Sequence, residues 1–218
     1  NDEIVRGMLS IGAVVSCISL LPKPIEYFRE QYPHVTFKIV EGDHFYLGEL
    51  LEQRKIELIA TRLPFEAMEQ PNQYEILPLP SDPYVVVMPS AWTEYAGKSS
   101  IRMKELAQFP LITLKTDQTK QKHEQVVSAC RRFGFEPNLI CECSSVAIIM
   151  SLVAAGIGAT VFPKSVMSSF PSTIVNRLDL ADADFQSDVG LIWLKGRYLS
   201  KRAQRFIDAF RESSTKPS

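Results

Sequence analysis

The sequence of 218 residues has no apolar run approaching the ~20 residues that a membrane-spanning helix needs. Its first residues, Asn-Asp-Glu-Ile-Val-Arg, lack the apolar core of a signal peptide, and a start at Asn1 rather than Met indicates a fragment or a processed chain. The 24 Lys and Arg residues are balanced by 25 Asp and Glu residues, so no excess of positive charge is present for a nucleic-acid surface. These absences predict a chain that neither spans a membrane nor binds DNA by itself.

Cysteine is scarce, and its spacing matches no metal or redox motif. The four cysteines lack the Cys-x-x-Cys pattern and are too few for a secreted disulfide framework. Cys141 and Cys143 face the same way on an expected strand, where a disulfide between residues two apart would be strained. We interpret Cys17, Cys130, Cys141 and Cys143 as small buried hydrophobic residues, with redox or metal roles as the alternative; this usage fits a cytoplasmic protein.

Catalytic signatures are absent as well. The sequence contains no Gly-x-Ser-x-Gly elbow, no His-Glu-x-x-His and no P-loop, and its carboxylates are scattered. The histidines His34, His44 and His123 sit in separate segments without metal-ligand spacing, and we interpret them as surface or partly packed imidazoles. The sequence therefore predicts no enzyme, no cofactor and no metal; an enzyme stays the alternative because catalytic groups meet in space.

Strand and helix signals alternate along the chain instead. Strands are expected at 8–13, 35–40 and 56–61, with helices over 21–32 and around 47–51, an order that predicts a parallel sheet with right-handed crossovers. Pro78, Pro80 and Pro83 predict a break and a domain crossing before a strand at 84–88. The remaining expectations are strands at 111–114, 139–143, 159–162 and 189–195, a short helix near 106–109, a helix over 126–133, an acidic loop at 179–188, and a closing helix capped by Ser200.

The run from 144 to 163 is the most informative stretch. Ser144 or Ser145 is expected to cap a helix with its hydroxyl, and Gly156 to end that helix in the left-handed conformation. Gly158 leaves room for a close backbone approach before a short apolar strand. A helix start beside a sheet edge is a site for a small anion, and ordinary α/β packing is the alternative. The whole pattern predicts an α/β binding protein with two lobes and a cleft.

The whole chain resembles the C-terminal effector-binding (regulatory) domain of LysR-type transcriptional regulators of bacteria. The pieces that carry the resemblance follow one another over nearly the full length, and none is specific alone. They are Gly7-x-Leu9-x-Ile11-Gly12, Leu20-Leu21-Pro22, Phe28-Arg29-x-x-Tyr32-Pro33-x-Val35, Glu41-Gly42, Leu50-Leu51-Glu52, Gly134-Phe135-x-Pro137, Leu152-Val153-Ala154-Ala155-Gly156-Ile157-Gly158 and Leu199-Ser200.

This resemblance implies an α/β fold like that of type 2 periplasmic-binding proteins, with two Rossmann-like lobes joined by two crossing strands. Lobe I would hold residues 1–80 plus 197–218, and lobe II residues 81–196. The family's amino-terminal helix-turn-helix, through which DNA is bound, is absent from this sequence. Members form homodimers and, at full length, tetramers; helices 21–32 and 121–133 would pair between copies, with plain core packing as the alternative.

The family's effector contacts can be carried over position by position. In lobe I they fall on Ser16, Asp43, His44, Thr61 and Arg62, and in lobe II on Lys115, Thr116, Thr119, Ser145 and Phe162. Hydroxyls with one or two cations favour a small anion, and Arg62 offers a planar fork for a carboxylate, although a surface arginine paired with a glutamate is the alternative. Asp43 replaces a threonine or serine, and its carboxylate would repel an anion unless it pairs with Arg62 or His44 or binds a ligand hydroxyl or amine.

The function implied by the resemblance is sensing of a small, anionic aromatic or aliphatic carboxylate that changes the dimer or tetramer arrangement and thereby controls transcription. The loop at 115–120 contains no cysteine, which disfavours a thiol switch of the peroxide-sensing kind. The alternative is a solute-binding protein of a transport system with the same two-lobed fold.

Overall fold

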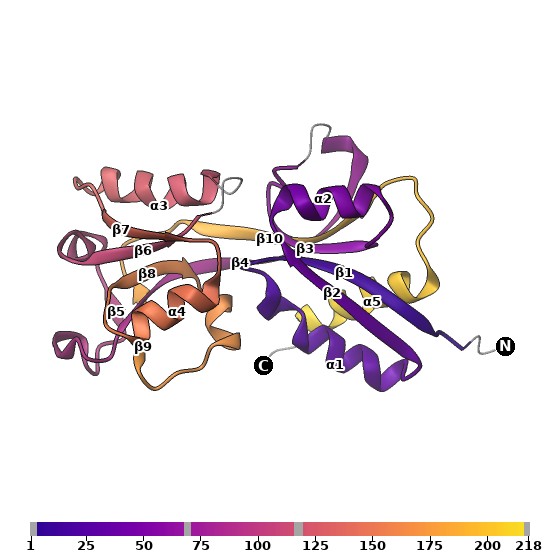
Figure 1. Cartoon of the computed structure of the whole chain (residues 1–218), viewed down its shortest axis with the longest axis horizontal. Helices are drawn as coiled ribbons and strands as arrows, with labels where there is room; N and C mark the ends of the chain where they lie inside the picture. The colour runs from indigo at the N-terminus through magenta and orange to yellow at the C-terminus, as the bar shows by residue number, and fades with distance from the viewer. Residues whose placement is uncertain (1–3, 68–70, 116–119, 216–218) are drawn as a thin grey trace. The chain divides into compact units, whose positions relative to one another are not determined.

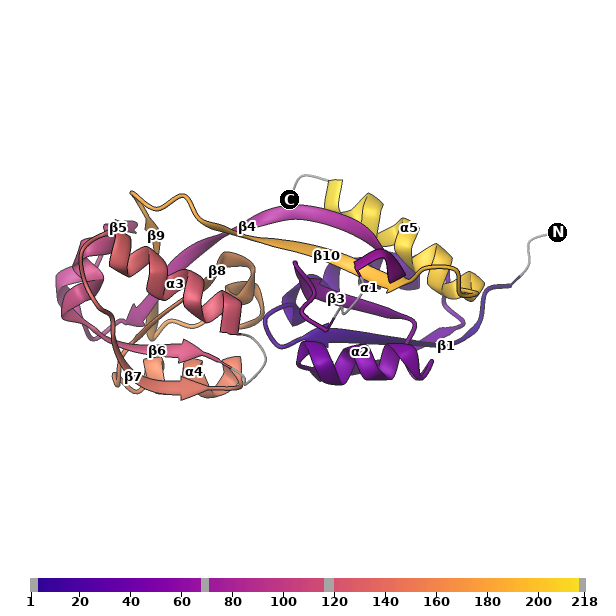
Figure 2. The same ribbon diagram turned by 90° about the horizontal axis from the view of Figure 1, so that it is seen from above.

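The computed structural model describes residues 4–67, 71–115 and 120–215 (Figure 1). Residue contacts divide the chain into two compact units, with Asn1–Ser81 and Asp188–Ser218 in unit 1 and Asp82–Ser187 in unit 2. Two strands connect them, β4 (Tyr74–Pro89) and β10 (Gln186–Leu194), and each passes from one unit into the other (Figure 2). The fold is thus the expected α/β arrangement of two lobes joined by two crossing strands.

Unit 1 is built on a sheet with strand order β2-β1-β3-β10-β4. β1 (Gly7–Val14) pairs in parallel with β2 (Val35–Gly42) and with β3 (Leu58–Arg62), whereas β10 pairs antiparallel with β3. α1 (Pro22–Gln31) and α5 (Lys201–Thr215) pack together on one face of this sheet, and α2 (His44–Glu52) covers the other (Figure 1). The apolar core between these layers includes Leu9, Ile11, Phe28, Leu47, Ile59 and Phe206.

Unit 2 repeats the α/β design with different elements. Its sheet has the order β4-β8-β6-β7, in which β6 (Pro110–Leu114) is parallel to β7 (Asn138–Cys143) and to β8 (Ala159–Pro163). α3 (Lys120–Arg132) and α4 (Val146–Ala154) connect these strands, and β9 (Val175–Leu180) pairs with β4 and with β5 (Ser100–Ile101). Short 3₁₀ helices complete the described elements, at Ile18–Leu20, Pro71–Gln73, Thr93–Tyr95, Met103–Gln108 and Lys164–Ser169.

Most local expectations agree with the structure. Gly156 ends α4 with a φ of 84°, and a Cβ on Gly158 would lie 2.7 Å from the carbonyl oxygen of Pro110, the predicted close approach. The Ser200 hydroxyl accepts a hydrogen bond from the N–H of Ala203 at 3.2 Å and caps α5. Ser145 occupies the position before α4, but its side chain makes no capping hydrogen bond, so the hydroxyl cap predicted there is wrong.

Two stretches differ from the sequence-based expectation. β4 begins at Tyr74 and runs through Pro78, Pro80 and Pro83, where a break was expected. β4 is the outer strand of the unit 1 sheet, so one of its edges faces away from that sheet. Pro78 and Pro80 are two residues apart, so the backbone nitrogens of both, which carry no N–H, can lie on this outer edge. The expected loop at 179–188 contains the end of β9 and the start of β10, since pairing with β4 imposes strand geometry on an acidic segment.

The two changes of unit along the chain also differ from the expected lobe boundaries. The first change of unit falls between Ser81 and Asp82, one residue from the expected position after 80. The second falls between Ser187 and Asp188, inside β10, rather than after 196. Residues 189–192 of β10 pair with β3 of unit 1, which agrees with the place of 188–194 in that unit.

No helix of the described chain is long and apolar enough to span a membrane. Within the same residues, no group of three or more His, Cys, Asp and Glu side chains is placed to hold a metal ion.

Replacing Gly158 by alanine should destabilise the protein by about 1–3 kcal/mol, because the added methyl group would collide with a backbone oxygen that cannot move aside. The midpoint of urea unfolding measures this loss. Gly134→Asn is the control: Gly134 has a φ of 88° with no neighbouring atom within 4 Å of an added Cβ, and asparagine tolerates that conformation. Equal stability of Gly158→Ala and the wild type would contradict the close approach.

Candidate functional site

Five residues gather at the carboxyl ends of the parallel strands of unit 1. Ser16 follows β1, Thr61 and Arg62 end β3, His44 begins α2, and Phe65 lies in the turn after β3. We call these five residues the Arg62 cluster. Parallel pairing of β1 with β3 brings the two strand ends to the same edge of the sheet, which is where open α/β sheets bind ligands.

Arg62 is buried and fixed in orientation. Its side chain is only 3% exposed, so Arg62 does not lie at the surface. The Nε–H donates to the Ser16 hydroxyl at 3.0 Å, and Nη2 donates to the Ser16 backbone oxygen at 2.6 Å. Two bonds to one residue hold the planar guanidinium in a single plane.

His44 belongs to a chain of buried hydrogen bonds. The backbone N–H of Glu66 donates to Nδ1 of His44 at 2.8 Å, so a neutral ring carries its proton on Nε2. That Nε2 faces the Thr61 hydroxyl at 3.4 Å, and the hydroxyl donates to the backbone oxygen of Arg62 at 3.0 Å. The imidazole also stacks on Phe65, with ring centroids 4.9 Å apart. The chain ties the start of α2 to the end of β3.

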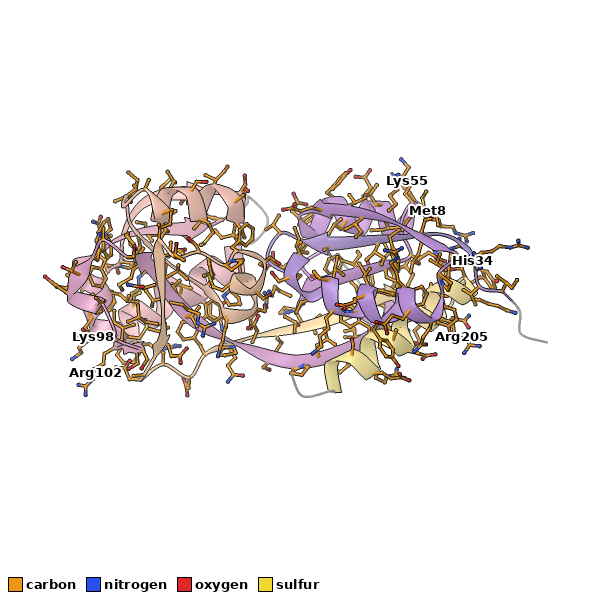
Figure 3. The ribbon with its side chains drawn as sticks, turned by 90° about the horizontal axis from the view of Figure 1, so that it is seen from below. Met8, His34, Lys55, Lys98, Arg102 and Arg205 are labelled. Atoms are coloured by element: carbon orange, nitrogen blue, oxygen red, sulfur yellow. The ribbon has the colours of Figure 1, made fainter. Side chains whose placement is uncertain are left out.

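The three histidines therefore differ in environment. His44 is 2% exposed, so the interpretation as a surface or partly packed imidazole is wrong for it. His34 lies at the surface, as expected (Figure 3). The side chain of His123 lies outside the described residues.

Asp43 is the residue before α2, and its carboxylate caps that helix. It accepts a hydrogen bond from the N–H of Tyr46 at 2.8 Å. A carboxylate at a helix amino terminus also interacts favourably with the helix dipole, which offsets part of its charge. The carboxylate expected to repel an anionic ligand is thus engaged by the helix.

The second set of predicted contacts belongs to unit 2. Lys115 forms an ion pair with Glu142 at 3.1 Å, and Ser145 lies half-buried before α4. Phe162 is 1% exposed and forms part of the apolar core behind β8. Thr116 and Thr119 lie outside the described residues.

The cysteines are free thiols. Cys17, Cys130 and Cys143 are buried, and the Sγ atoms of Cys141 and Cys143 lie 3.6 Å apart, which confirms that these two share one face of the strand. Burial raises the pKa of both Cys130 and Cys143 to about 11, because a thiolate is poorly solvated there. Both side chains are therefore protonated at neutral pH, as expected of small buried hydrophobic residues.

Sequence reasoning missed the role of Phe65 and of the backbone N–H of Glu66. Both act on His44 from the turn after β3, and neither residue type signals a binding role. The available signal was positional: an aromatic residue directly after Leu63-Pro64, at the carboxyl end of a buried strand.

Comparisons with known proteins agree on one family. The family model described as "LysR substrate binding domain" matches residues 3–215. The HTH-type transcriptional regulator BsdA of Bacillus subtilis (strain 168) is 31% identical over 208 residues, which cover 95% of this chain and 70% of that protein. The transcriptional dual regulator GltC of the same organism is 27% identical over 222 residues, covering 93% and 66%.

Solved structures share the fold. CbnR, a LysR family transcriptional regulator, matches with a TM-score of 0.80 at 16% identity and covers 96% of this chain and 71% of its own. The effector binding domain of QuiR in complex with shikimate matches with a TM-score of 0.77 at 20% identity, covering 96% and 98%. A C206 mutant of Corynebacterium glutamicum OxyR matches with a TM-score of 0.77 at 24% identity, and the match covers 97% of this chain and 65% of its own. The chain thus spans about two thirds of the longer proteins and nearly all of the isolated QuiR domain.

Replacing Ser16 by alanine removes the acceptor of the Arg62 Nε–H while keeping the backbone oxygen that Nη2 uses. Because the donor is charged and buried, we expect a loss of about 1.5–3 kcal/mol in stability, measured by urea unfolding. Ser144→Ala, at an exposed serine, is the matched control and should unfold like the wild type. If both variants match the wild type, the hydrogen bond does not hold Arg62.

Proposed function

Because the chain belongs to the LysR family, as the effector-binding domain of a LysR-type transcriptional regulator, we propose that its effector is a small organic anion held at the Arg62 cluster. The observation that carries this proposal is the buried guanidinium of Arg62, fixed in one plane by Ser16. Relatives that share this domain are transcriptional regulators, which argues against both an enzyme and a solute carrier for transport.

The electrostatics of the cluster favour an anion. A guanidinium removed from water interacts more strongly with a nearby charge, because the effective dielectric constant around it is lower. A carboxylate on the ligand matches its fork with two parallel hydrogen bonds. Asp43, next to His44 in the sequence, carries a negative charge, and its role as the cap of α2 offsets part of its repulsion. The structure of the QuiR domain contains shikimate, which is a carboxylate and an example of such a ligand on the same fold.

The His44 chain would then set the shape of the site rather than its charge. His44, Thr61 and Phe65 fix the edge of the sheet beside Arg62, so a ligand finds a rigid surface. In unit 2, Lys115, Ser145 and Phe162 stay predicted effector contacts, since Lys115 and Ser145 carry donors at strand or helix ends.

The regulatory step we propose is a change in the arrangement of protomers. An effector that binds one dimer or tetramer arrangement better shifts the equilibrium by its differential affinity, typically about 1–3 kcal/mol. Helices 21–32 and 121–133 are the proposed pairing elements between copies. A helix-turn-helix domain, as in the HTH-type relatives, would convert this shift into altered contact with DNA.

Thermal unfolding with benzoate, succinate and shikimate, beside neutral benzamide, tests the effector class. A ligand at 100 times its Kd adds about 2.7 kcal/mol to stability, which raises the Tm by several degrees. We expect at least one acid to raise the Tm of the wild type and not that of Arg62→Gln. Arg131→Gln, at an exposed arginine paired with Glu136 in unit 2, should respond like the wild type.

Two outcomes would refute the anion site. One is no shift of the wild type with any acid. The other is an equal shift in Arg62→Gln. Arg62→Lys keeps the charge but loses the fork, so it provides a folded comparison if the neutral variant is unstable.

Small-angle scattering and sedimentation of the chain, with and without the acid that raises the Tm, test the regulatory step. We expect a change in the dimensions or in the mass of the assembly on binding. Unchanged scattering and mass at saturating acid would show that binding does not act through protomer arrangement.

A further inference from the structure

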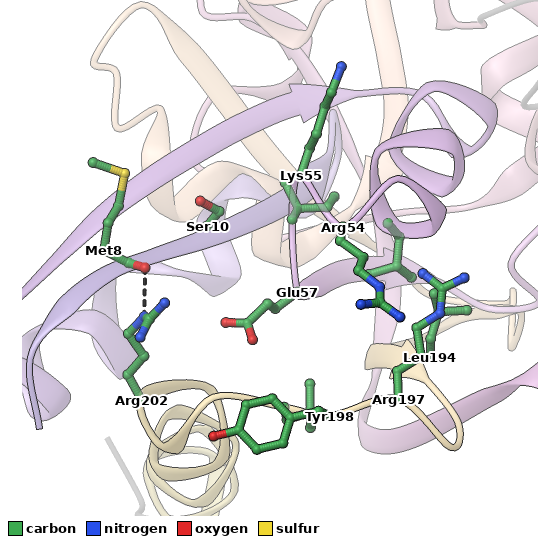
Figure 4. A pocket seen from close by; sticks show the side chains of 12 residues that line it. Met8, Ser10, Arg54, Lys55, Glu57, Leu194, Arg197, Tyr198 and Arg202 are labelled. Atoms are coloured by element: carbon green, nitrogen blue, oxygen red, sulfur yellow. Dashed lines mark hydrogen bonds between the residues drawn. The ribbon is translucent and has the colours of Figure 1, made fainter.

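A pocket lies in unit 1, at the opposite end of the parallel strands from the Arg62 cluster. It has a volume of about 310 Å³ and is lined by the amino-terminal half of β1, the end of α2 with the turn after it, and the segment joining β10 to α5 (Figure 4). β3 separates the two sites along its length, because Glu57 precedes the strand and lines the pocket whereas Arg62 ends it.

Positive charge dominates the lining of this pocket. It contains the cations Arg54, Lys55, Arg197 and Arg202 and a single carboxylate, that of Glu57. Among the residues that the structure describes, none of the four cations forms an ion pair with a carboxylate. Four cations from two segments far apart in the sequence thus line one pocket, with an excess of positive charge.

Hydrogen bonds hold two of these arginines in place without neutralising them. Arg197 Nη1 donates to the backbone oxygen of Glu52 at the end of α2, at 2.7 Å. Arg202 Nε donates to the backbone oxygen of Met8 at 2.6 Å, a bond drawn in Figure 4. Both acceptors are uncharged carbonyl groups, so each guanidinium keeps its full charge and is already positioned.

Glu57 supplies one negative charge against four positive ones, so the lining keeps an excess of positive charge. Its oxygens are held at the start of α5. They accept from the N–H of Ser200 at 3.0 Å and from its hydroxyl at 2.7 Å, at the amino terminus of α5. The helix dipole attracts a carboxylate at that position. In Figure 4 the Glu57 side chain lies between Arg202 on one side and Arg54 and Arg197 on the other.

We propose that this pocket binds a small organic anion with two or more negative charges, a phosphate ester or a polycarboxylate. Arginine forks match the oxygens of both groups, and several forks converging on one pocket favour a multivalent anion over a single carboxylate. The volume lies at the lower end of the range for ligand pockets and suits a small metabolite. Tyr198, 86% exposed at the rim, supplies a phenol that can cover a seated ligand.

Isothermal titration calorimetry of the chain at low ionic strength tests the proposal. The probes are citrate, glycerol 3-phosphate and inorganic phosphate, with glycerol as the neutral control. We expect citrate or glycerol 3-phosphate to bind, with an affinity that falls as sodium chloride is added. Comparing the three anions distinguishes a polycarboxylate from a phosphate ester and from phosphate alone.

The variant Arg54→Asn/Arg197→Gln should weaken that binding about tenfold or more, since it removes two charged donors. Asparagine is chosen because Arg54 has a φ of 59°, which asparagine tolerates. Arg205→Gln, on the exposed face of α5 outside the pocket, is the matched control and should bind like the wild type (Figure 3). The Tm of each variant verifies its fold.

The same titration in Arg62→Gln separates this site from the proposed effector site. Retained binding there, with loss in the double variant, supports a second site whether or not Arg62 binds an effector. No heat with any of the three anions, or equal affinity in the wild type and the double variant, would overturn the proposal. So would binding of a short DNA duplex that depends on Arg54 and Arg197 when none of the small anions binds.

Discussion

The parallel pairing of β1 with β2 and β3 is the constraint on which unit 1 depends. Parallel strands cannot be joined by tight hairpins, so each connection must return across the sheet, and α1 and α2 make these returns. Helices then bury the strands on both faces, and core residues such as Leu9, Ile11 and Leu58 are fully buried. The Arg62 cluster and the pocket lined by Arg54, Lys55, Arg197 and Arg202 accordingly lie at the two ends of these strands.

The arginines at these two ends of the strands differ in their exposure to solvent. Arg62 is buried, and Ser16 fixes its orientation, so it can recognise a partner only in one geometry. Arg54 and Arg197 are exposed, and water and salt screen their charges, so several of them must act together to hold an anion. The first arrangement suits selection of one ligand shape, and the second suits attraction of a high charge density.

The crossing between the units is anchored on each side by side-chain hydrogen bonds. In unit 1 the Ser81 hydroxyl of β4 donates to the carboxylate of Asp188 in β10 at 2.9 Å, which ties the two crossing strands together. In unit 2 the buried Asp82 accepts from the N–H and hydroxyl of Ser165. Neighbouring residues of β4, Ser81 and Asp82, are thus hydrogen-bonded to different units.

The sequence by itself determined the order of strands and helices, the family, the stop signal at Gly156 and the helix cap at Ser200, because hydrophobic periodicity and capping chemistry act between near neighbours. It also placed Ser16, His44, Thr61 and Arg62 in one site, through the family resemblance. Local signals failed where pairing partners overrode them, as in the proline-containing start of β4 and the acidic segment before β10. Burial and contact were decided only by the tertiary structure. Ser16 and Arg62 are 46 residues apart and Glu57 and Ser200 are 143 apart, and no periodic pattern reports which distant residues the sheet brings together.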